Sequence, residues 1–309
     1  MSKKYNVTIL GYGEMGHAMQ ALLGSTHHLS FWDKQPQAGM NMLSLEQAIP
    51  SADFVFFCLP VNPHREIITR VKPLLKEGSI CLSIAKGLDE TGQTAAQVFQ
   101  QVLSEQFAYA LVYGPMISEE LRLGRYGFAQ LGCLQNDACL RTLELFRHSQ
   151  LYLQPTTDIN GISWSVILKN VYALLFGMAD ELKLGDNMRG FLAVESVREL
   201  DSIVSRMGGK STSPYHLAGL GDLITTATSE SSHHHSLGRQ LAKGNREHIA
   251  GEGVHTLAMV EKHQLFCMAD FPLFTLVHTI INEPVDIDEK LFEYVDAAKT
   301  RKLSNNRQR

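Results

Sequence analysis

The sequence predicts two domains: an α/β domain with a doubly wound, mostly parallel sheet over residues 1–155, and an all-helical domain over residues 156–309. Two observations lead to this prediction. Short β-rich runs alternate with helical stretches up to Pro155, in the order typical of βαβ units. Beyond Pro155 helical periodicity dominates, from about Gly161 to Gly208 and again from Leu257 onward. The chain of 309 residues is also long enough for two hydrophobic cores.

Seven runs in the first half are predicted as strands. Several are apolar at nearly every position, as parallel strands covered on both faces must be. The predicted strands are Tyr5–Leu10, His28–Trp32, Phe54–Leu59, Ile80–Ile84, Tyr109–Tyr113, Phe128–Leu134 and Leu151–Leu153. Helical stretches such as His64–Leu75 and Thr91–Ser104 lie between them, and Thr91 is a candidate N-cap.

The composition is that of a globular enzyme. The chain has a net charge of −4 and is 44% hydrophobic and 19% charged, so we expect neither a nucleic-acid nor a membrane partner. The N-terminal segment lacks the apolar stretch of a secretory signal, so a cytoplasmic protein is expected. The cysteines show no Cys-x-x-Cys or other ligand-like spacing, and we expect reduced, buried thiols. They are Cys58, Cys81, Cys133, Cys139 and Cys267.

A glycine motif of the form G-x-G-x-x-G follows directly on the first predicted strand. Its residues are Gly11, Tyr12, Gly13, Glu14, Met15 and Gly16. The motif opens a helix-like stretch, so its glycines can serve for a tight turn, close approach to a pyrophosphate, and close packing of helix on strand. The helix N-terminus would face the phosphates with unpaired N–H groups. This context predicts a Rossmann dinucleotide site, and the alternative is an ordinary glycine-rich βα turn.

Asp33 ends the second predicted strand, about twenty residues past the glycines. A carboxylate there accepts hydrogen bonds from the adenine ribose and repels a 2′-phosphate. The sequence therefore favours NAD over NADP, although the neighbouring Lys34 partly offsets the repulsion. The alternative is that Asp33 is a plain turn residue.

Ligands of open α/β sheets collect beyond the carboxyl ends of the strands. Two further segments follow strands there, Lys86-Gly87 and Gly114-Pro115. Each on its own would be a routine loop.

Lys169 lies in the middle of a predicted helix, residues 166–176, with apolar residues on nearly every side. A buried amine is costly to desolvate unless it meets a partner or lines a polar cavity. The same environment lowers its pKa, which suits a proton donor near neutrality, and carbonyl reduction needs such a donor. Lys169 is thus a candidate catalytic residue, with Asn170 as a positioning amide. The alternative is a snorkelling or structural lysine.

These residues resemble the NAD(P)-dependent glycerol-3-phosphate dehydrogenases of bacterial type, over roughly residues 5–285. The order and spacing of several segments together carry the resemblance. They are Gly11 to Gly16, Ser83 to Gly87, Gly114-Pro115, Leu168 to Val171, Gly185 to Asn187, Gly219 to Leu223 and Gly251 to Val254. The resemblance implies an N-terminal Rossmann domain, an all-helical second domain, and an active site between them.

The resemblance also implies roles for individual residues. Lys169 is similar to the family's catalytic lysine, which exchanges a proton with the carbonyl of dihydroxyacetone phosphate, and Asp222 and Lys86 complete the expected catalytic set. The expected substrate contacts are Lys86, Gly114, Met116, Lys169, Asn170, Asp222, Ser232, His233 and His234. The expected cofactor contacts are Gly11 to Gly16, Asp33, Lys86, Ser118 and Glu252.

The chain departs from the family pattern at two substrate positions. The family usually continues Gly-Pro with Ser-Phe-Ala, where this chain has Met116, Ile117 and Ser118. The family also carries Ser-Arg-Asn where this chain has Ser232 followed by histidines, and histidine lacks the permanent charge and bidentate fork of arginine. Phosphate affinity is therefore an open question. The histidines at 233 to 235 are not expected to bind a metal, since consecutive residues rarely converge on one ion.

Three functions remain open from the sequence. The first is an NAD-dependent dehydrogenase acting on sn-glycerol 3-phosphate and dihydroxyacetone phosphate. The second keeps the hydride chemistry on another small hydroxy acid or carbonyl compound, and the third is a dinucleotide-binding protein without catalysis. A homodimer is expected, because helical second domains of this kind often pair across apolar faces.

Overall fold

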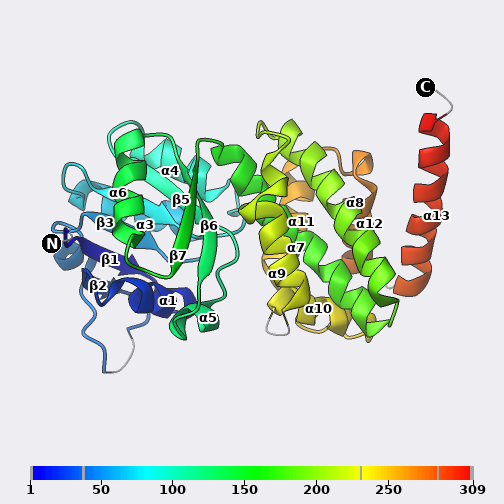
Figure 1. Cartoon of the computed structure of the whole chain (residues 1–309), viewed down its shortest axis with the longest axis horizontal. Helices are drawn as coiled ribbons and strands as arrows, with labels where there is room; N and C mark the ends of the chain where they lie inside the picture. Colours follow the sequence, from blue (N-terminus) through cyan, green and yellow to red (C-terminus); the bar gives the residue numbers. More distant parts are fainter. Residues whose placement is uncertain (1–2, 37–38, 230–231, 284, 307–309) are drawn as a thin grey trace.

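The computed structural model describes residues 3–36, 39–229, 232–283 and 285–306, with side chains through Thr300. A single seven-stranded sheet forms the first half of the chain (Figure 1). Its strands are β1 (Asn6–Leu10), β2 (His28–Trp32), β3 (Phe54–Phe57), β4 (Ile80–Ser83), β5 (Ala108–Tyr113), β6 (Gly127–Cys133) and β7 (Leu151–Thr156). Their order is β2-β1-β3-β4-β5-β6-β7, and only the β5–β6 pair is antiparallel. All seven predicted strands are confirmed, with ends that differ by up to three residues.

Helices cover both faces of this sheet, which confirms the doubly wound prediction. On one face α1 (Glu14–Leu23) and α6 (Asn136–Phe146) bury their apolar residues against β1, β4 and β5. On the other face the short α2 (Leu45–Ala48), α3 (His64–Val71) and α4 (Ala95–Leu103) pack against β3. The connections include η1 (Lys72–Leu74) and α5 (Ser118–Arg122).

The predicted N-cap of α4 is wrong. Thr94, not Thr91, caps this helix. Its hydroxyl accepts a hydrogen bond from the Gln97 N–H, and Gln97 Oε1 accepts one from the Thr94 N–H. This reciprocal capping box satisfies two free donors of the first turn. The Thr91 hydroxyl instead donates to Asp89 in the preceding turn, 2.7 Å away.

The second half of the chain is helical throughout, as predicted, and helices also fill the stretch between the two predicted periodic regions (Figure 1). Its elements are α7 (Ile159–Glu181), α8 (Gly185–Arg206), η2 (Ser213–Tyr215), the π-helical turn η3 (Leu217–Gly221), α9 (Asp222–Thr228), α10 (His233–Ala242), α11 (Glu252–His263), η4 (Met268–Asp270), α12 (Pro272–Asn282) and α13 (Ile287–Asn306).

Helix α7 is the central helix of this half. It is long and apolar enough to cross a membrane by length and composition alone, but its side chains are buried inside the protein. Helices α8 to α12 pack around it, and its apolar cluster continues into Leu111 and Tyr113 of β5. One core therefore joins the helices to the sheet.

Three glycines let helices approach α7 at backbone distance. A methyl group at Gly177 would collide with the carbonyl oxygen of His235, and one at Gly238 would collide with that of Leu174. In the same way, a Cβ at Gly253 would lie 2.6 Å from the carbonyl oxygen of Asn170. The N-termini of α10 and α11 are thereby held close to the middle of α7.

The expectation of buried thiols holds only in part. All five cysteines are free, and Cys81 and Cys133 are buried, while Cys58 and Cys139 are half-buried. Cys267 is exposed, which corrects the prediction. It immediately precedes η4, in a surface connection between α11 and α12 that the apolar residues around it in the sequence do not reveal.

Candidate active site

The ammonium group of Lys169 is buried at the middle of α7, with 4% of the residue exposed. Its Nζ donates a hydrogen bond to Thr226 Oγ1 at 2.6 Å and lies 3.1 Å from Asp222 Oδ2. The amine thus has both the partners and the polar cavity expected of a lysine in an apolar helix.

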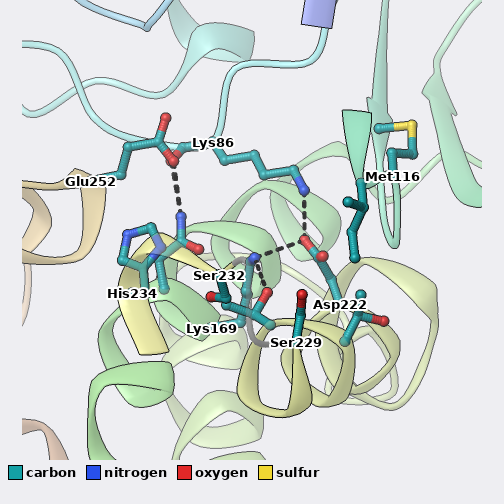
Figure 2. A pocket seen from close by; sticks show the side chains of 12 residues that line it. Lys86, Met116, Lys169, Asp222, Ser229, Ser232, His234 and Glu252 are labelled. Carbon is teal, nitrogen blue, oxygen red and sulfur yellow. Dashed lines mark hydrogen bonds and ion pairs between the residues drawn. The ribbon is translucent and has the colours of Figure 1, made fainter. Parts of the chain in front are cut away.

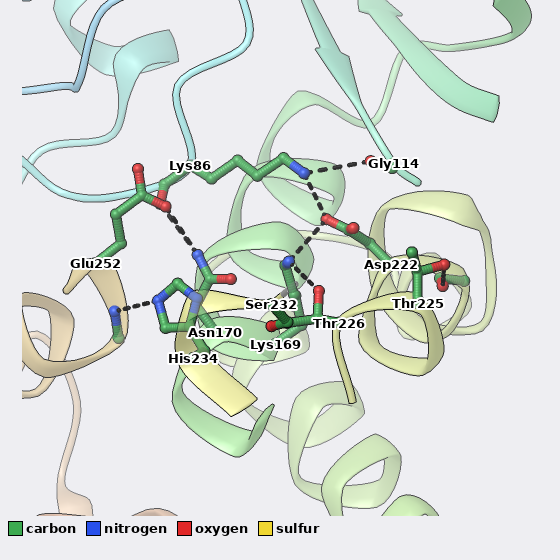
Figure 3. Close-up of polar contacts among 12 residues, drawn as sticks. Lys86, Gly114, Lys169, Asn170, Asp222, Thr225, Thr226, Ser232, His234 and Glu252 are labelled. Carbon is green, nitrogen blue, oxygen red and sulfur yellow. Dashed lines mark hydrogen bonds and ion pairs between the residues drawn. The ribbon is translucent and has the colours of Figure 1, made fainter. Parts of the chain in front are cut away.

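Asp222 is shared between two lysines (Figure 3). The Nζ atom of Lys86 lies 2.7 Å from the same Oδ2 atom and also donates to the Gly114 carbonyl at 3.2 Å. Lys86 follows β4 and Gly114 follows β5, so adjacent parallel strands deliver both groups to one edge of the sheet. Lys86, Lys169 and Asp222 form what we call the lysine–aspartate cluster.

The pKa values of Lys169 and Asp222 are both lowered, for different reasons. Burial lowers the pKa of Lys169 to about 8, and the charge of Lys86 adds to this shift, while Asp222 opposes it. Burial disfavours ionisation of Asp222, but the two ammonium groups together lower the pKa of its carboxyl. The site therefore holds an ionised carboxylate next to an amine that can lose or gain its proton near neutral pH.

Asn170 links the cluster to α11. Its Nδ2 donates to Glu252 Oε2 at 3.0 Å and to the carbonyl oxygen of Lys86 at 3.4 Å. Burial raises the pKa of the Glu252 carboxyl, against the opposing effect of the two lysines. Asn170 thus holds a carboxyl group from α11 next to the loop that carries Lys86.

The three consecutive histidines point to three different partners. His233 Nε2 bonds the Ala250 carbonyl at 2.8 Å, His234 Nε2 accepts the Gly253 N–H at 3.2 Å, and His235 Nε2 lies 2.7 Å from Asp180 Oδ2. Burial lowers the pKa of His234 to about 3, so its ring is neutral. Within the described parts of the chain, no three His, Cys, Asp or Glu side chains are arranged to hold a metal ion.

A pocket of about 210 Å³ opens at the lysine–aspartate cluster (Figure 2). Its lining residues are Lys86, Met116, Ile117, Lys169, Asn170, Asp222, Thr225, Thr226, Ser229, Ser232, His234 and Glu252. The fold thus brings together most of the residues assigned to the substrate from the sequence. Gly114 and His233 are not among the lining residues, although the Gly114 carbonyl accepts a hydrogen bond from Lys86.

Sequence reasoning missed Ile117, Thr225, Thr226 and Ser229. Ser229 is the first residue after α9, whereas Thr225 and Thr226 follow Asp222 by three and four residues and share its face of the helix. That spacing is a signal in the sequence, since the face that carries Asp222 into the pocket must carry them too.

The glycine turn lies at the carboxyl end of β1 and is shaped for a dinucleotide. Gly11 has a φ of +91°, and a Cβ there would lie 2.6 Å from the Cys58 carbonyl oxygen. A Cβ at Gly16 would collide with the Gly11 carbonyl, whereas one at Gly13 would meet no atom within 4 Å. The turn therefore needs Gly11 and Gly16 for its own fold and leaves open space at Gly13, before the N-terminus of α1, where a pyrophosphate fits.

Asp33 lies beside this turn. Its Oδ2 accepts the Tyr12 N–H at 2.7 Å and its Oδ1 accepts the Gln35 N–H at 2.9 Å, so both oxygens are fixed by backbone groups. Across the turn, the Ser118 hydroxyl donates to Glu14 Oε2 at 3.3 Å. Ser118 is outside the substrate pocket, and Glu252 lines it.

The chain was compared with known proteins. The family model for the N-terminus of NAD-dependent glycerol-3-phosphate dehydrogenase matches residues 36–139, and the model for the C-terminus matches residues 158–291. A glycerol-3-phosphate dehydrogenase (NAD(P)+) of Mycobacterium bovis is 30% identical over 251 residues, which cover 79% of this chain and 73% of that protein. A relative of the same name from Dehalococcoides mccartyi is 29% identical over 275 residues, 85% of this chain and 76% of its own.

A solved structure shows the same fold. The crystal structure of glycerol-3-phosphate dehydrogenase from Coxiella burnetii matches with a TM-score of 0.81 and 23% identity, and the match covers 94% of this chain and 99% of that chain. The sequence matches to both halves and the 30% identical relative show that the chain belongs to the NAD-dependent glycerol-3-phosphate dehydrogenase family.

Proposed function

We propose that this protein catalyses reversible, NAD-dependent hydride transfer between sn-glycerol 3-phosphate and dihydroxyacetone phosphate. The observation that carries the proposal is the Lys169 ammonium, buried in a pocket with Asp222 and Lys86 at the edge of the sheet where the glycine turn also lies. A proton donor near a dinucleotide site is what reduction of a ketone requires. Residues 1–155 would bind the cofactor, and residues 156–309 would supply most of the pocket.

Each group of the pocket has a task in this reaction. The bound dinucleotide supplies or accepts the hydride. The Lys169 ammonium donates its proton to the carbonyl oxygen of the ketone, and the neutral amine takes the proton back in the direction of alcohol oxidation. Asp222 holds the two lysines in place. Lys86 would face both the substrate and the cofactor.

The remaining pocket residues position the substrate and exclude water. Asn170 keeps its amide fixed on Glu252, and the apolar side chains of Met116 and Ile117 close one wall. A low-dielectric wall strengthens the interaction of the charged groups with the developing alkoxide.

The cofactor is held in this proposal by Gly11 to Gly16, Asp33, Lys86, Ser118 and Glu252. NAD is preferred over NADP, because the Asp33 carboxylate is fixed in position by the N–H groups of Tyr12 and Gln35 and would repel a 2′-phosphate. Ser118 approaches the same turn through its bond to Glu14.

We also propose a cytoplasmic homodimer. The helical half carries exposed apolar side chains, Val194 and Tyr215, at a groove that Val197 and Leu220 also line. Pairing of two copies across this face would cover them. Sedimentation equilibrium tests the assembly, and a monomer at micromolar concentration would contradict it.

The direct test of the reaction is NADH oxidation with dihydroxyacetone phosphate as substrate. We expect turnover with NADH, and formation of NADH when sn-glycerol 3-phosphate and NAD are supplied instead. Protein that binds NADH in a fluorescence titration yet oxidises none with millimolar substrate would refute the proposed reaction. A panel of other small hydroxyketones would then identify the substrate.

A further inference from the structure

Part of the pocket is lined by uncharged side chains that do not belong to the lysine–aspartate cluster. We call this part the neutral wall, and it consists of Thr225, Ser229, Ser232 and His234. The four residues come from α9, the segment after it, and the start of α10. Figure 2 shows His234 and Ser229 on either side of Lys169, with Lys86 above them in this view. A substrate whose carbonyl lies at Lys169 would extend its far end onto this wall.

The positively charged side chains described in the pocket lining are both paired with the Asp222 carboxylate. Lys86 and Lys169 are the only lysine or arginine residues among the described residues of the lining. Both contact Asp222 Oδ2, and Glu252 adds a second carboxyl group to the lining. The lining therefore offers at most one net positive charge, whereas a phosphate ester near neutral pH carries nearly two negative charges.

The histidines do not supply the missing charge. His234 is the one of the three that lines the pocket, and its Nε2 accepts the Gly253 N–H, so its proton is on the other ring nitrogen. Protonation of Nε2 would leave two donors facing each other. His233 has its Nε2 on the Ala250 carbonyl and is outside the lining.

We propose that the neutral wall binds the far end of the substrate through uncharged hydrogen bonds, so that the protein also reduces unphosphorylated three-carbon hydroxyketones such as dihydroxyacetone. The inference rests on the proposed function and adds a substrate class to it. The carbonyl carbon receives hydride from NADH and its oxygen receives the Lys169 proton. NADH becomes NAD, and dihydroxyacetone becomes glycerol.

The test compares kcat/KM for dihydroxyacetone phosphate with kcat/KM for dihydroxyacetone in the wild-type protein. We expect a ratio below about 200, the discrimination that a site without a dedicated polar partner achieves. A higher ratio would overturn the inference, because the phosphate would then have a strong partner, such as the N-terminus of α10. No turnover with either substrate would refute the proposed function instead, which keeps the two failures separate.

Two histidine-to-arginine variants test the missing charge. His233→Arg places a permanent cation beside the neutral wall, and we expect the KM for dihydroxyacetone phosphate to fall by about tenfold or more, with the KM for dihydroxyacetone within about twofold. His148→Arg adds the same charge at an exposed position after α6, far from the pocket, and both KM values should stay within about twofold. Equal effects of the two variants would contradict the inference.

Binding without turnover gives an independent measurement. Calorimetric titrations of sn-glycerol 3-phosphate and glycerol into the wild-type protein should give affinities within about 200-fold of each other. The His234→Gln variant, whose side-chain oxygen can still accept the Gly253 N–H, should change the two affinities by similar factors, because the neutral wall contacts both ligands through uncharged groups. A glycerol 3-phosphate affinity that collapses in this variant alone would show that His234 carries the phosphate contact, and would overturn the proposal.

Discussion

The glycine turn after β1 and the lysine–aspartate cluster differ in what they offer to a ligand. The turn offers backbone N–H groups and open space before α1, because a Cβ at Gly13 would meet no atom within 4 Å. The cluster works through buried side-chain charge, with one carboxylate between two amines. A larger side chain in the turn should therefore weaken cofactor binding, and removal of a charged side chain from the cluster should lower the reaction rate.

Lys169→Ala should cause the largest loss. Removal of the proton donor is expected to lower kcat by about 10²- to 10⁴-fold, the usual contribution of a positioned acid, with NADH affinity unchanged. Stopped-flow reduction and a fluorescence titration of NADH measure the two quantities. Lys243→Ala, at an exposed position just after α10, is the matched control. Undiminished turnover in Lys169→Ala would contradict the role of this amine and would point to a non-catalytic binding protein.

Asp222→Asn should move the pH profile as well as lower the rate. The Lys169 ammonium has a pKa of about 8, so ketone reduction should decline as pH rises through 8, while alcohol oxidation should increase. Asp222 raises that pKa, and its loss should shift the declining limb to lower pH. A pH–rate profile checks this, with Asp186→Asn at the exposed start of α8 as control. An unshifted limb would mean that another group titrates.

Gly13→Ala should weaken the cofactor rather than the fold. The added methyl group meets no protein atom within 4 Å, so the melting temperature should hold, but it occupies the space for the pyrophosphate. We expect the Kd of NADH to rise by about tenfold or more, which corresponds to about 1.4 kcal/mol. Gly190→Ala, also in open space within α8, is the control and should leave the Kd unchanged. Equal Kd values in both variants would place the pyrophosphate elsewhere.

Asp33→Asn should have the smallest effect, on the choice between cofactors. Without the carboxylate, the repulsion of a 2′-phosphate is lost, and the preference for NADH over NADPH should fall by about tenfold. The amide oxygen can still accept the Tyr12 N–H, so the glycine turn should keep its shape, although the bond from the Gln35 N–H is lost. Competition titrations with the two reduced cofactors measure the ratio. An unchanged ratio would assign the preference to another residue.

Local patterns in the sequence predicted the frame of the molecule. Short apolar runs between helical stretches predicted the seven strands, and the glycine motif predicted the turn at β1, because both signals lie in neighbouring residues. Lys169 was also identifiable, since the cost of burying an amine makes a lysine within an apolar helix conspicuous.

The sequence by itself thus determined the sheet of the first half, the helical second half, the glycine turn and the buried amine. Only the tertiary structure decided that His234 lines the pocket while His233 is turned to Ala250, and that Thr226 bonds Lys169. One residue along a helix rotates a side chain by about 100°, so the direction of each side chain depends on how that helix is seated against distant segments. For α10 that seating is fixed by backbone contact at Gly177 and Gly238, which no local pattern specifies.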